Sequence, residues 1–512
     1  MAAAAGVATR SDQSTVRAVV ALFVLFGLAA RVWMLLTRMG GLDADEGIVG
    51  LMARDILDGD FPLFYWGQPY GGPHEPLLTA GFFAVFGAST VVLKVVAILL
   101  SGAACVLVWR VGTRIMGETA AIAAALLFWV WPAAFVWWSV KSRGFYHVAL
   151  VIGLAVVLLV LRLAQRESVL DMALLGALVG TGIWCTPQTV LLTGPALLWL
   201  AIRRPSLLRL APVAAAAGAV AAFPFWDYNL ETGWVSFEAS QATLAGYGER
   251  LRGIFATGLP GALGLRLPDG SRWIAGGLGV AWYVGLLALF AAAIAREVFA
   301  RRARDERRPA RILLLATAGA YPFVLALSPY SAFVDHPRYL YYLGALCALL
   351  VAGALAALRP WALVAALVFA MTLTTVALTT SNREHAFYPA SEGALIPEDL
   401  GPLVDYLVEH DVDHVYADYW LAYYLSFQTG ERIVATPYRG ALRDEEADQR
   451  VRMYPRPGYL FVAGAASEPA FGTEVDEANL PHRRVEVGGF VLYALEENVP
   501  PELFPATQAA QP

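Results

Sequence analysis

Three carboxylates stand within four positions near the start of the chain, in the stretch GLDADEGIVG at residues 41–50. Asp43, Asp45 and Glu46 follow directly on an apolar run, in a sequence with only 15% charged residues. A carboxylate tuned by burial and by its neighbours can act as a general base. Two other interpretations stay open: a cap for the helix that begins near Glu46, and a set of oxygen ligands for Mg²⁺ or Mn²⁺. The cluster therefore predicts a catalytic base, a helix cap or a divalent-cation site.

Four basic residues stand at the ends of later apolar runs. The segment SVKSRGF contains Lys141 and Arg143, and Lys141 is one of only two lysines in the chain. The segment SPYSAFVDHPRYLYY contains His336 and Arg338. Such groups can hold a phosphate and stabilise its charge as it departs. They can equally reach to lipid headgroups or satisfy a loop, so a phosphate site and a structural role both stay open.

The stretch YWGQPYGGPHEP, residues 65–76, combines aromatic, amide and acidic side chains. The residues with hydrogen-bonding groups are Tyr65, Gln68, Tyr70, His74 and Glu75. Aromatic faces with polar groups beside them suit a sugar, but aromatic residues also gather where a membrane meets water. We interpret this stretch as a candidate substrate-binding segment and keep the aromatic belt as the alternative.

The composition indicates a membrane protein. Of 512 residues, 58% are hydrophobic, and many stand in runs of about twenty, each long enough to cross a bilayer. The net charge of −5 argues against a nucleic-acid partner, and the three cysteines lack metal-ligand spacing. The sequence predicts about 11 transmembrane helices, near 16–36, 89–109, 118–138, 145–162, 170–185, 188–202, 207–225, 273–295, 311–328, 339–357 and 360–380.

Arginine placement predicts the orientation of these helices. With eleven spans, the arginines of the short loops, including the run RRARDERRPAR at 301–311, all fall on one side, which is then cytoplasmic. The loop 37–88 and the tail after 380 then lie outside the cell membrane. Within the loop, 47–58 and 77–88 have the pattern of helices lying along the interface.

The tail after residue 380 has a different character. It alternates a helical stretch at 398–410, a strand at 414–418, a helix at 419–428 and a strand at 432–436. Two further apolar stretches, 459–464 and 483–495, follow in the sequence. This alternation predicts a small external α/β domain over 381–512, after a transmembrane domain over 1–380.

Several motifs of the first loop together resemble those of a known family. An Asp-Glu pair is followed by a helix, then by Gly59-Asp60-Phe61-Pro62, a Pro-rich turn and the F-x-x-F-G pattern of residues 83–87. This order is similar to that of the GT-C membrane glycosyltransferases, and more narrowly of glycosyltransferase family 39. That group includes protein O-mannosyltransferases and the lipid A aminoarabinose transferases.

The resemblance implies an inverting glycosyltransferase. Such an enzyme moves a sugar from a polyprenyl-phosphate donor to a hydroxyl of a lipid, glycan or protein, at the outer face of the membrane. By position, Asp45 would be the general base and Glu46 its partner. Lys141 or Arg143, together with Arg338 and His336, would hold the donor phosphate, and Asp43 and the 65–76 segment would contact substrate. Where many relatives read Glu-Lys-Pro, this chain reads His74-Glu75-Pro76, so either His74 replaces the lysine or the donor is held differently.

Two other functions stay open from the residues alone. A lipid or polysaccharide transporter or flippase would line a path with charges, but here the acids cluster in one loop and no inverted repeat of broken helices is visible. A metal-dependent hydrolase would use Asp43, Asp45 and Glu46 as ligands, but no His-rich second ligand set accompanies them. The expected partners are the lipid-linked donor, its acceptor and membrane lipids.

Overall fold

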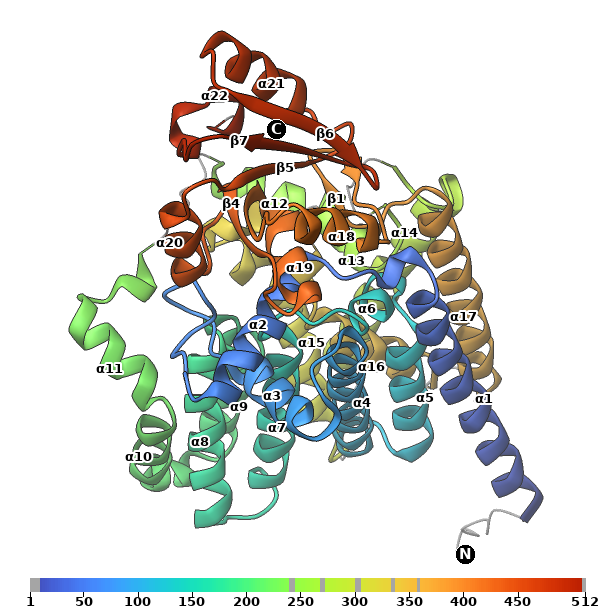
Figure 1. Ribbon diagram of the computed structural model, residues 1–512. Helices are drawn as coiled ribbons and strands as arrows, with labels where there is room; N and C mark the ends of the chain where they lie inside the picture. Colours follow the sequence, from blue (N-terminus) through green and yellow to red (C-terminus); the bar gives the residue numbers. More distant parts are fainter. Residues whose placement is uncertain are drawn as a thin grey trace, which may run out of the picture. The chain divides into compact units, whose positions relative to one another are not determined.

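The computed structural model describes residues 10–238, 245–267, 272–299, 305–332, 337–356 and 360–508 (Figure 1). These residues form two compact units. The first contains Met1–Met34, Leu99–Ser139 and Val148–Ala386, and the second contains Leu35–Ile98, Val140–His147 and Phe387–Pro512. The second unit therefore contains residues of both the predicted first loop and the predicted C-terminal domain. The predicted domain boundary between residues 380 and 381 stays a prediction.

Most of the first unit is helical, as its apolar sequence requires. Of the described residues, five helices are long and apolar enough to cross a membrane, or up to six if one bent pair is a single span. The five are α1 (Arg10–Leu35), α4 (Thr90–Ile115), α7 (Tyr146–Leu163), α14 (Gly277–Phe299) and α17 (Pro360–Arg383). A multi-pass membrane protein is thus confirmed, whereas the count of eleven spans stays a prediction.

Two predicted spans are broken in the structure. The segment 118–138 forms α5 (Glu118–Val130) and α6 (Ala133–Trp138), because Pro132 cannot continue a helix. The segment 207–225 lies within the bent pair of helical segments Pro205–Ala221 and Phe223–Thr232, which meet at 69°. The other elements of this unit are α8 (Val169–Cys185), η2 (Pro187–Thr189), α9 (Val190–Arg203), η3 (Pro205–Leu210), α10 (Ala211–Ala221), α11 (Phe223–Thr232), η4 (Val235–Phe237), α12 (Tyr247–Gly253), η5 (Ile254–Gly258), α13 (Leu259–Ala262), α15 (Arg308–Leu325), η6 (Pro329–Ala332), η7 (Pro337–Leu340) and α16 (Leu343–Ala356).

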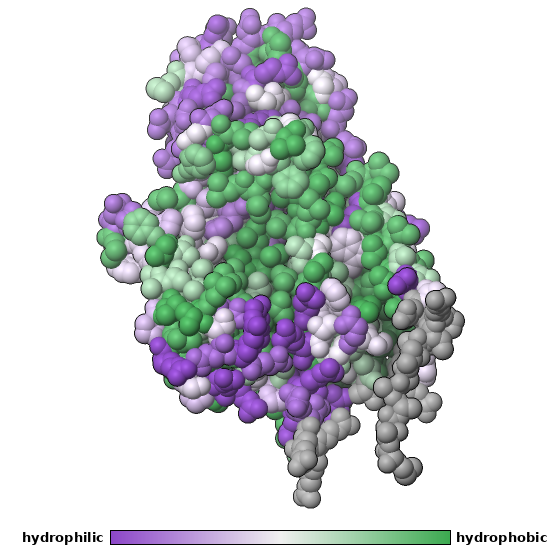
Figure 2. Space-filling view, turned by 90° about the horizontal axis from the view of Figure 1, so that it is seen from below, coloured by the Kyte–Doolittle hydropathy of each residue, from purple (hydrophilic) through white to green (hydrophobic). Residues whose placement is uncertain are grey.

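Large apolar side chains stay exposed on the surface of the membrane-spanning helices. Leu22 and Leu25 of α1, and Leu278 and Phe299 of α14, are all more than half exposed. Figure 2 shows apolar side chains gathered over a broad area of one face. Such patches are far larger than a protein in water normally exposes, and lipid tails are the solvent that suits them.

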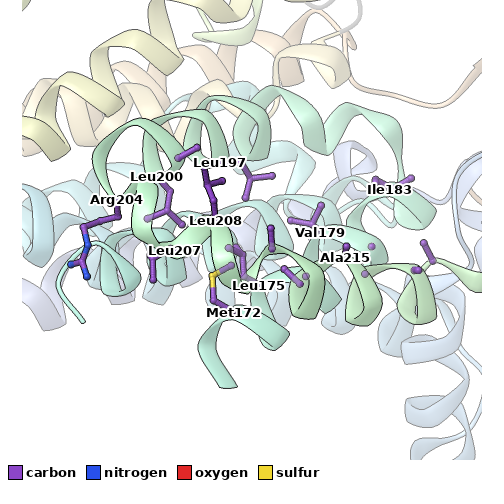
Figure 3. Close-up of a pocket in the computed structure, with 18 of the residues that line it drawn as sticks. Met172, Leu175, Val179, Ile183, Leu197, Leu200, Arg204, Leu207, Leu208 and Ala215 are labelled. Carbon is purple, nitrogen blue, oxygen red and sulfur yellow. The ribbon is translucent and has the colours of Figure 1, made fainter. Parts of the chain in front are cut away.

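Helices α8, α9 and α10 of the first unit line a half-open apolar cavity of about 590 Å³ (Figure 3). Aliphatic side chains and glycines line most of it, and Arg204 is the charged residue in the lining. Helices α8 and α10 pack very closely beside it, since a Cβ on Gly180 would lie 2.1 Å from the carbonyl oxygen of Gly218. Small residues at such positions let membrane helices approach each other.

The C-terminal part of the second unit is a mixed five-stranded sheet in the order β4-β3-β5-β7-β6. Strands β3, β4 and β5 are parallel, and β7 is antiparallel to both β5 and β6. Helices α20, α21 and α22 contribute to one buried cluster with the sheet, which includes Tyr459, Phe461 and Phe471. The predicted α/β character of this region is confirmed. The elements are β1 (Ala390–Ser391), β2 (Ala394–Leu395), α18 (Gly401–Glu409), β3 (His414–Asp418), α19 (Tyr419–Thr429), β4 (Val434–Arg439), α20 (Glu445–Met453), β5 (Gly458–Val462), α21 (Glu468–Glu477), β6 (His482–Val487), β7 (Phe490–Leu495), η8 (Pro501–Leu503) and α22 (Pro505–Gln508).

The N-terminal part of the second unit contains η1 (Arg38–Gly40), α2 (Ala44–Asp58) and α3 (His74–Phe86), close to the two interfacial helices that the sequence predicts. Helix α2 packs against α3 and α19. A Cβ on Gly47 would lie 2.4 Å from the carbonyl oxygen of Tyr423, and one on Gly50 would lie 2.3 Å from the ring of Phe427. These two glycines therefore allow α19 to lie directly on α2.

Candidate active site

Asp43 determines where α2 begins. Its backbone is extended, and its carboxylate accepts a hydrogen bond from the backbone N–H of Glu46 at 3.3 Å. This is the geometry of an N-cap, so the capping interpretation is confirmed for Asp43. Asp45 and Glu46 then lie in the first turn, where the helix dipole favours negative charge.

Glu46 is the centre of a buried ionic cluster. Its carboxylate lies 2.5 Å from Lys94 Nζ and 2.6 Å from Lys141 Nζ, and it accepts a hydrogen bond from the backbone N–H of Ser142 at 2.9 Å. The Glu46 side chain is fully buried. Burying a charge costs several kcal/mol unless a partner offsets it, and here each lysine has that partner. Glu46 thereby fastens the start of α4 and the segment 140–147 to α2.

Arg143 joins the two aspartates. Its Nη1 donates to Asp43 Oδ1 and to Asp45 Oδ2, each at 3.1 Å, while its Nη2 donates to Asp43 Oδ2 at 2.9 Å. Lys141 Nζ lies 3.0 Å from Asp43 Oδ2. Burial raises the pKa of Asp43, but Arg143, Lys141 and Lys94 together outweigh it and hold that pKa well below its usual range. Asp43 is therefore a fixed negative charge and a poor proton acceptor.

Asp45 is the most exposed of the three acids. Its side chain is 17% exposed, against 10% and 0% for the other two. Asp45 Oδ1 accepts a hydrogen bond from the hydroxyl of Tyr419 at 2.7 Å, and Oδ2 accepts one from Arg143. The hydroxyl of Tyr65 donates to the backbone oxygen of Asp45 at 2.9 Å. This carboxylate is held in one orientation and is still partly accessible, as a general base must be.

Tyr65 and Tyr419 are buried hydrogen-bond donors at Asp45. Burial, followed by the charge of Asp45, raises the pKa of both phenols well above the usual value, so both keep their protons. The sequence pointed to Tyr65 but missed Tyr419. Its only local signal was its position at the start of a predicted helix, directly after the strand 414–418.

Arg443 is a second residue that the sequence did not reveal, and it lies in the loop after β4. Its Nη1 donates to the carbonyl oxygen of Gly67 at 3.3 Å. With the side-chain amide oxygen of Gln68 turned towards it, that oxygen accepts from Nη1 at 2.9 Å and from Nη2 at 3.2 Å. Gly67 has a φ of +61°, and a Cβ there would lie 2.4 Å from the carbonyl oxygen of Leu442. A glycine is required at this close approach.

The remaining residues of the 65–76 stretch are placed as follows. Tyr70 and His74 are partly buried. Burial lowers the pKa of His74 to about 4, although a hydrogen bond with the Gly72 backbone opposes this. The imidazole is uncharged at neutral pH, and this favours the second alternative, in which the donor is held by other groups.

Glu75 is fully buried and is directed at the segment 140–147. Its Oε1 accepts from the hydroxyl of Ser142 at 2.6 Å and from the backbone N–H of Arg143 at 3.2 Å, and its Oε2 lies 3.8 Å from His147 Nδ1. The structure therefore brings Glu75 to the loop that carries Lys141 and Arg143. These hydrogen bonds of Glu75 hold that loop in position.

The other two predicted phosphate-binding residues are His336 and Arg338. His336 lies outside the described residues. Arg338 is partly buried in η7 and belongs to the first unit. Their proposed role stays a prediction.

A divalent cation at Asp43, Asp45 and Glu46 stays a prediction from the sequence. Among the described residues, no group of three or more His, Cys, Asp or Glu side chains could hold a metal ion. The carboxylates of Asp43, Asp45 and Glu46 instead face ammonium and guanidinium groups. In the structure, positively charged side chains therefore neutralise the three carboxylates.

Part of the sequence matches the model of a known protein family. Residues 69–228 match the family model described as dolichyl-phosphate-mannose-protein mannosyltransferase. No curated protein matches the sequence significantly.

Solved structures match nearly the whole chain. ArnT from Cupriavidus metallidurans in the apo state has 14% sequence identity and a TM-score of 0.60, over 97% of this chain and 100% of that one. The same protein bound to undecaprenyl phosphate has 15% identity and a TM-score of 0.59, over 96% and 99%. The archaeal oligosaccharyltransferase AglB from Archaeoglobus fulgidus, in complex with an inhibitory peptide and a dolichol-phosphate, has 12% identity and a TM-score of 0.55, over 97% and 77%. These likenesses confirm the predicted GT-C fold class and the resemblance to that group of membrane glycosyltransferases.

Proposed function

We propose that the protein is an inverting glycosyltransferase. It would move a sugar from a polyprenyl-phosphate donor to a hydroxyl acceptor at the outer face of the cell membrane. The observation that carries this proposal is the state of Asp45, a partly accessible carboxylate held by Tyr419 and Arg143 beside a set of fully buried ion pairs. The likeness to proteins solved with undecaprenyl phosphate and dolichol-phosphate supports the donor class.

The chemistry assigns one role to Asp45. It accepts the proton of the acceptor hydroxyl as that oxygen bonds to the anomeric carbon. The bond between the anomeric carbon and the phosphate oxygen breaks, and the electron pair leaves with the phosphate. Attack from the face opposite the leaving group inverts the anomeric centre. The products are the glycosylated acceptor and polyprenyl phosphate.

The other residues of the cluster hold this base in place. Lys141 is fully buried against Glu46 and Asp43, so we assign it to the ionic cluster. Arg143 has a 10% exposed side chain and is the more accessible of the two sequence-derived cations. From the sequence, Arg338 and His336 remain candidates for binding the donor phosphate. The gathering of arginines in the loops of one side supports an orientation in which the site faces the outside of the cell.

An Asp45→Asn variant tests the proposal. The purified full-length protein would be incubated with undecaprenyl-phosphate hexose and pentose donors, and release of undecaprenyl phosphate would be measured together with sugar transfer to added acceptors. We expect the variant to keep the thermal unfolding profile of the wild type and to lose at least about a thousandfold in transfer rate, as enzymes do without their base. Transfer at a rate near that of the wild type would exclude Asp45 as the base. Lipid movement across a vesicle membrane without release of undecaprenyl phosphate would indicate a transporter instead.

A further inference from the structure

The three cations nearest the acids are already neutralised. Lys94 pairs with Glu46, Lys141 pairs with Glu46 and Asp43, and Arg143 pairs with both aspartates. A donor phosphate that approached any of them would compete with a carboxylate already in contact.

Arg443 differs from these three cations. Among the ion pairs of the described residues, none joins Arg443 to a carboxylate. Its guanidinium instead contacts neutral acceptors, the carbonyl oxygens of Trp66 and Gly67 and the amide of Gln68. Its Nε is buried and makes no hydrogen bond within the part of the chain that is described. Among the described residues, neutral groups therefore hold the guanidinium of Arg443 in place, and no ion pair places a carboxylate in direct contact with it.

The location of Arg443 connects it to the base. Tyr419 donates to Asp45 Oδ1 and also interacts with Arg443. Although burial alone lowers it, the neighbouring Tyr419, Tyr65 and Asp45 raise the pKa of Arg443, so the guanidinium remains charged. A charged group and the general base therefore flank the same hydroxyl.

We propose that Arg443 binds the phosphate of the lipid-linked donor, next to Asp45. The planar guanidinium can donate two parallel hydrogen bonds to phosphate oxygens, which a lysine cannot do. Its charge stabilises the phosphate as the bond to the sugar breaks. The C-terminal α/β region then supplies part of the active site. This inference rests on the proposed function.

Binding of two probes that differ only in the phosphate tests it. Undecaprenyl phosphate and undecaprenol would each be titrated into the full-length protein in nanodiscs. We expect the wild type to prefer the phosphate, and Arg443→Gln to reduce affinity for undecaprenyl phosphate about 10- to 100-fold while undecaprenol affinity stays constant. Arg443→Lys, which keeps the charge but not the planar fork, should fall between the two.

A matched control separates this role from a structural one. Arg452 lies in the same region and pairs with Asp448 and Glu502, so Arg452→Gln should leave both affinities unchanged. If Arg443 served only to fasten the loop at Gly67, Arg443→Gln would weaken both probes equally, and the inference would be overturned. Equal undecaprenyl phosphate binding by wild type and Arg443→Gln would overturn it too, while the proposed function would survive if the wild type still transferred sugar. A wild type that neither prefers the phosphate nor transfers sugar would overturn both.

Discussion

The apolar cavity of the first unit and the ionic cluster of the second use opposite kinds of packing. The cavity of about 590 Å³ between α8, α9 and α10 is lined mainly by aliphatic side chains and glycines, which offer shape but no directed polar groups. The cluster around Glu46 links six charged side chains through ion pairs, so that each has at least one partner of opposite charge. The volume of a cavity therefore does not by itself identify a candidate reactive site. Buried charged side chains are a better indicator, because burying a charge costs free energy.

The largest expected effect comes from removing the centre of the cluster. Glu46→Ala should destabilise the protein by about 3–5 kcal/mol, because it leaves the buried Lys94 without its carboxylate and the buried Lys141 with Asp43 alone. Thermal unfolding followed by tryptophan fluorescence in detergent measures this. The control is Glu384→Ala, which removes an exposed pair with Arg272 and should cause a much smaller loss of stability. Equal losses would show that burial of the cluster is not what makes it costly.

A matched pair of glycine substitutions compares the two units directly. In Gly47→Ala the new Cβ meets a carbonyl oxygen of α19, and in Gly180→Ala it meets one of α10. Each should cost about 1–3 kcal/mol through overpacking. The activity per folded molecule should fall only for Gly47→Ala, since that change moves α19 and Tyr419 away from Asp45. A loss of activity in Gly180→Ala would break the distinction between the two regions.

Tyr419→Phe should have a smaller effect, confined to the reaction. Loss of one hydrogen bond to a charged carboxylate should lower kcat about tenfold. Tyr438→Phe is the control, since that hydroxyl donates to the carboxylate of Glu392 at 2.9 Å, away from Asp45. A kcat of Tyr419→Phe equal to that of the wild type would remove Tyr419 from the site.

The smallest expected effect is a pH-dependent gain in stability from Asp55→Asn. Burial, then Glu431 and Asp444, raise the pKa of Asp55 to about 7. The folded state therefore holds this proton at pH values where the unfolded chain has lost it, and the associated stability disappears as the pH rises from about 4 to 7. Asp55→Asn should raise Tm by about 1–3 °C at pH 8 and leave it unchanged near pH 4. The exposed Asp58→Asn is the control, and an equal gain at both pH values would contradict the assignment.

The sequence predicted local features well and distant contacts poorly. The strand 414–418 coincides with β3, because alternating apolar residues and flanking polar ones specify a strand locally. The helix break at Pro132 was not predicted, although the proline itself signals a break, because the apolar residues around it have the pattern of one continuous span. Helix α20 was missed, since its sequence EEADQRVRM has few apolar residues.

For the site, spacing alone brought out Asp43, Asp45 and Glu46. The role of Arg443 could not be inferred, because its contact with Gly67 joins residues 376 positions apart. No composition, period or motif near Arg443 specifies that contact. Only the packed tertiary structure does.

The hydrogen bond between Tyr419 and Asp45 joins two residues 374 positions apart, and this has a consequence for synthesis. At about 5–20 residues per second, roughly 20–75 seconds separate the translation of the two residues. Late in that interval the nascent chain contains its acids and its membrane helices but still lacks Tyr419 and Arg443. A chain released early by truncation or by a stalled ribosome would have its base without the groups that orient it, so full-length translation itself acts as a check on activity.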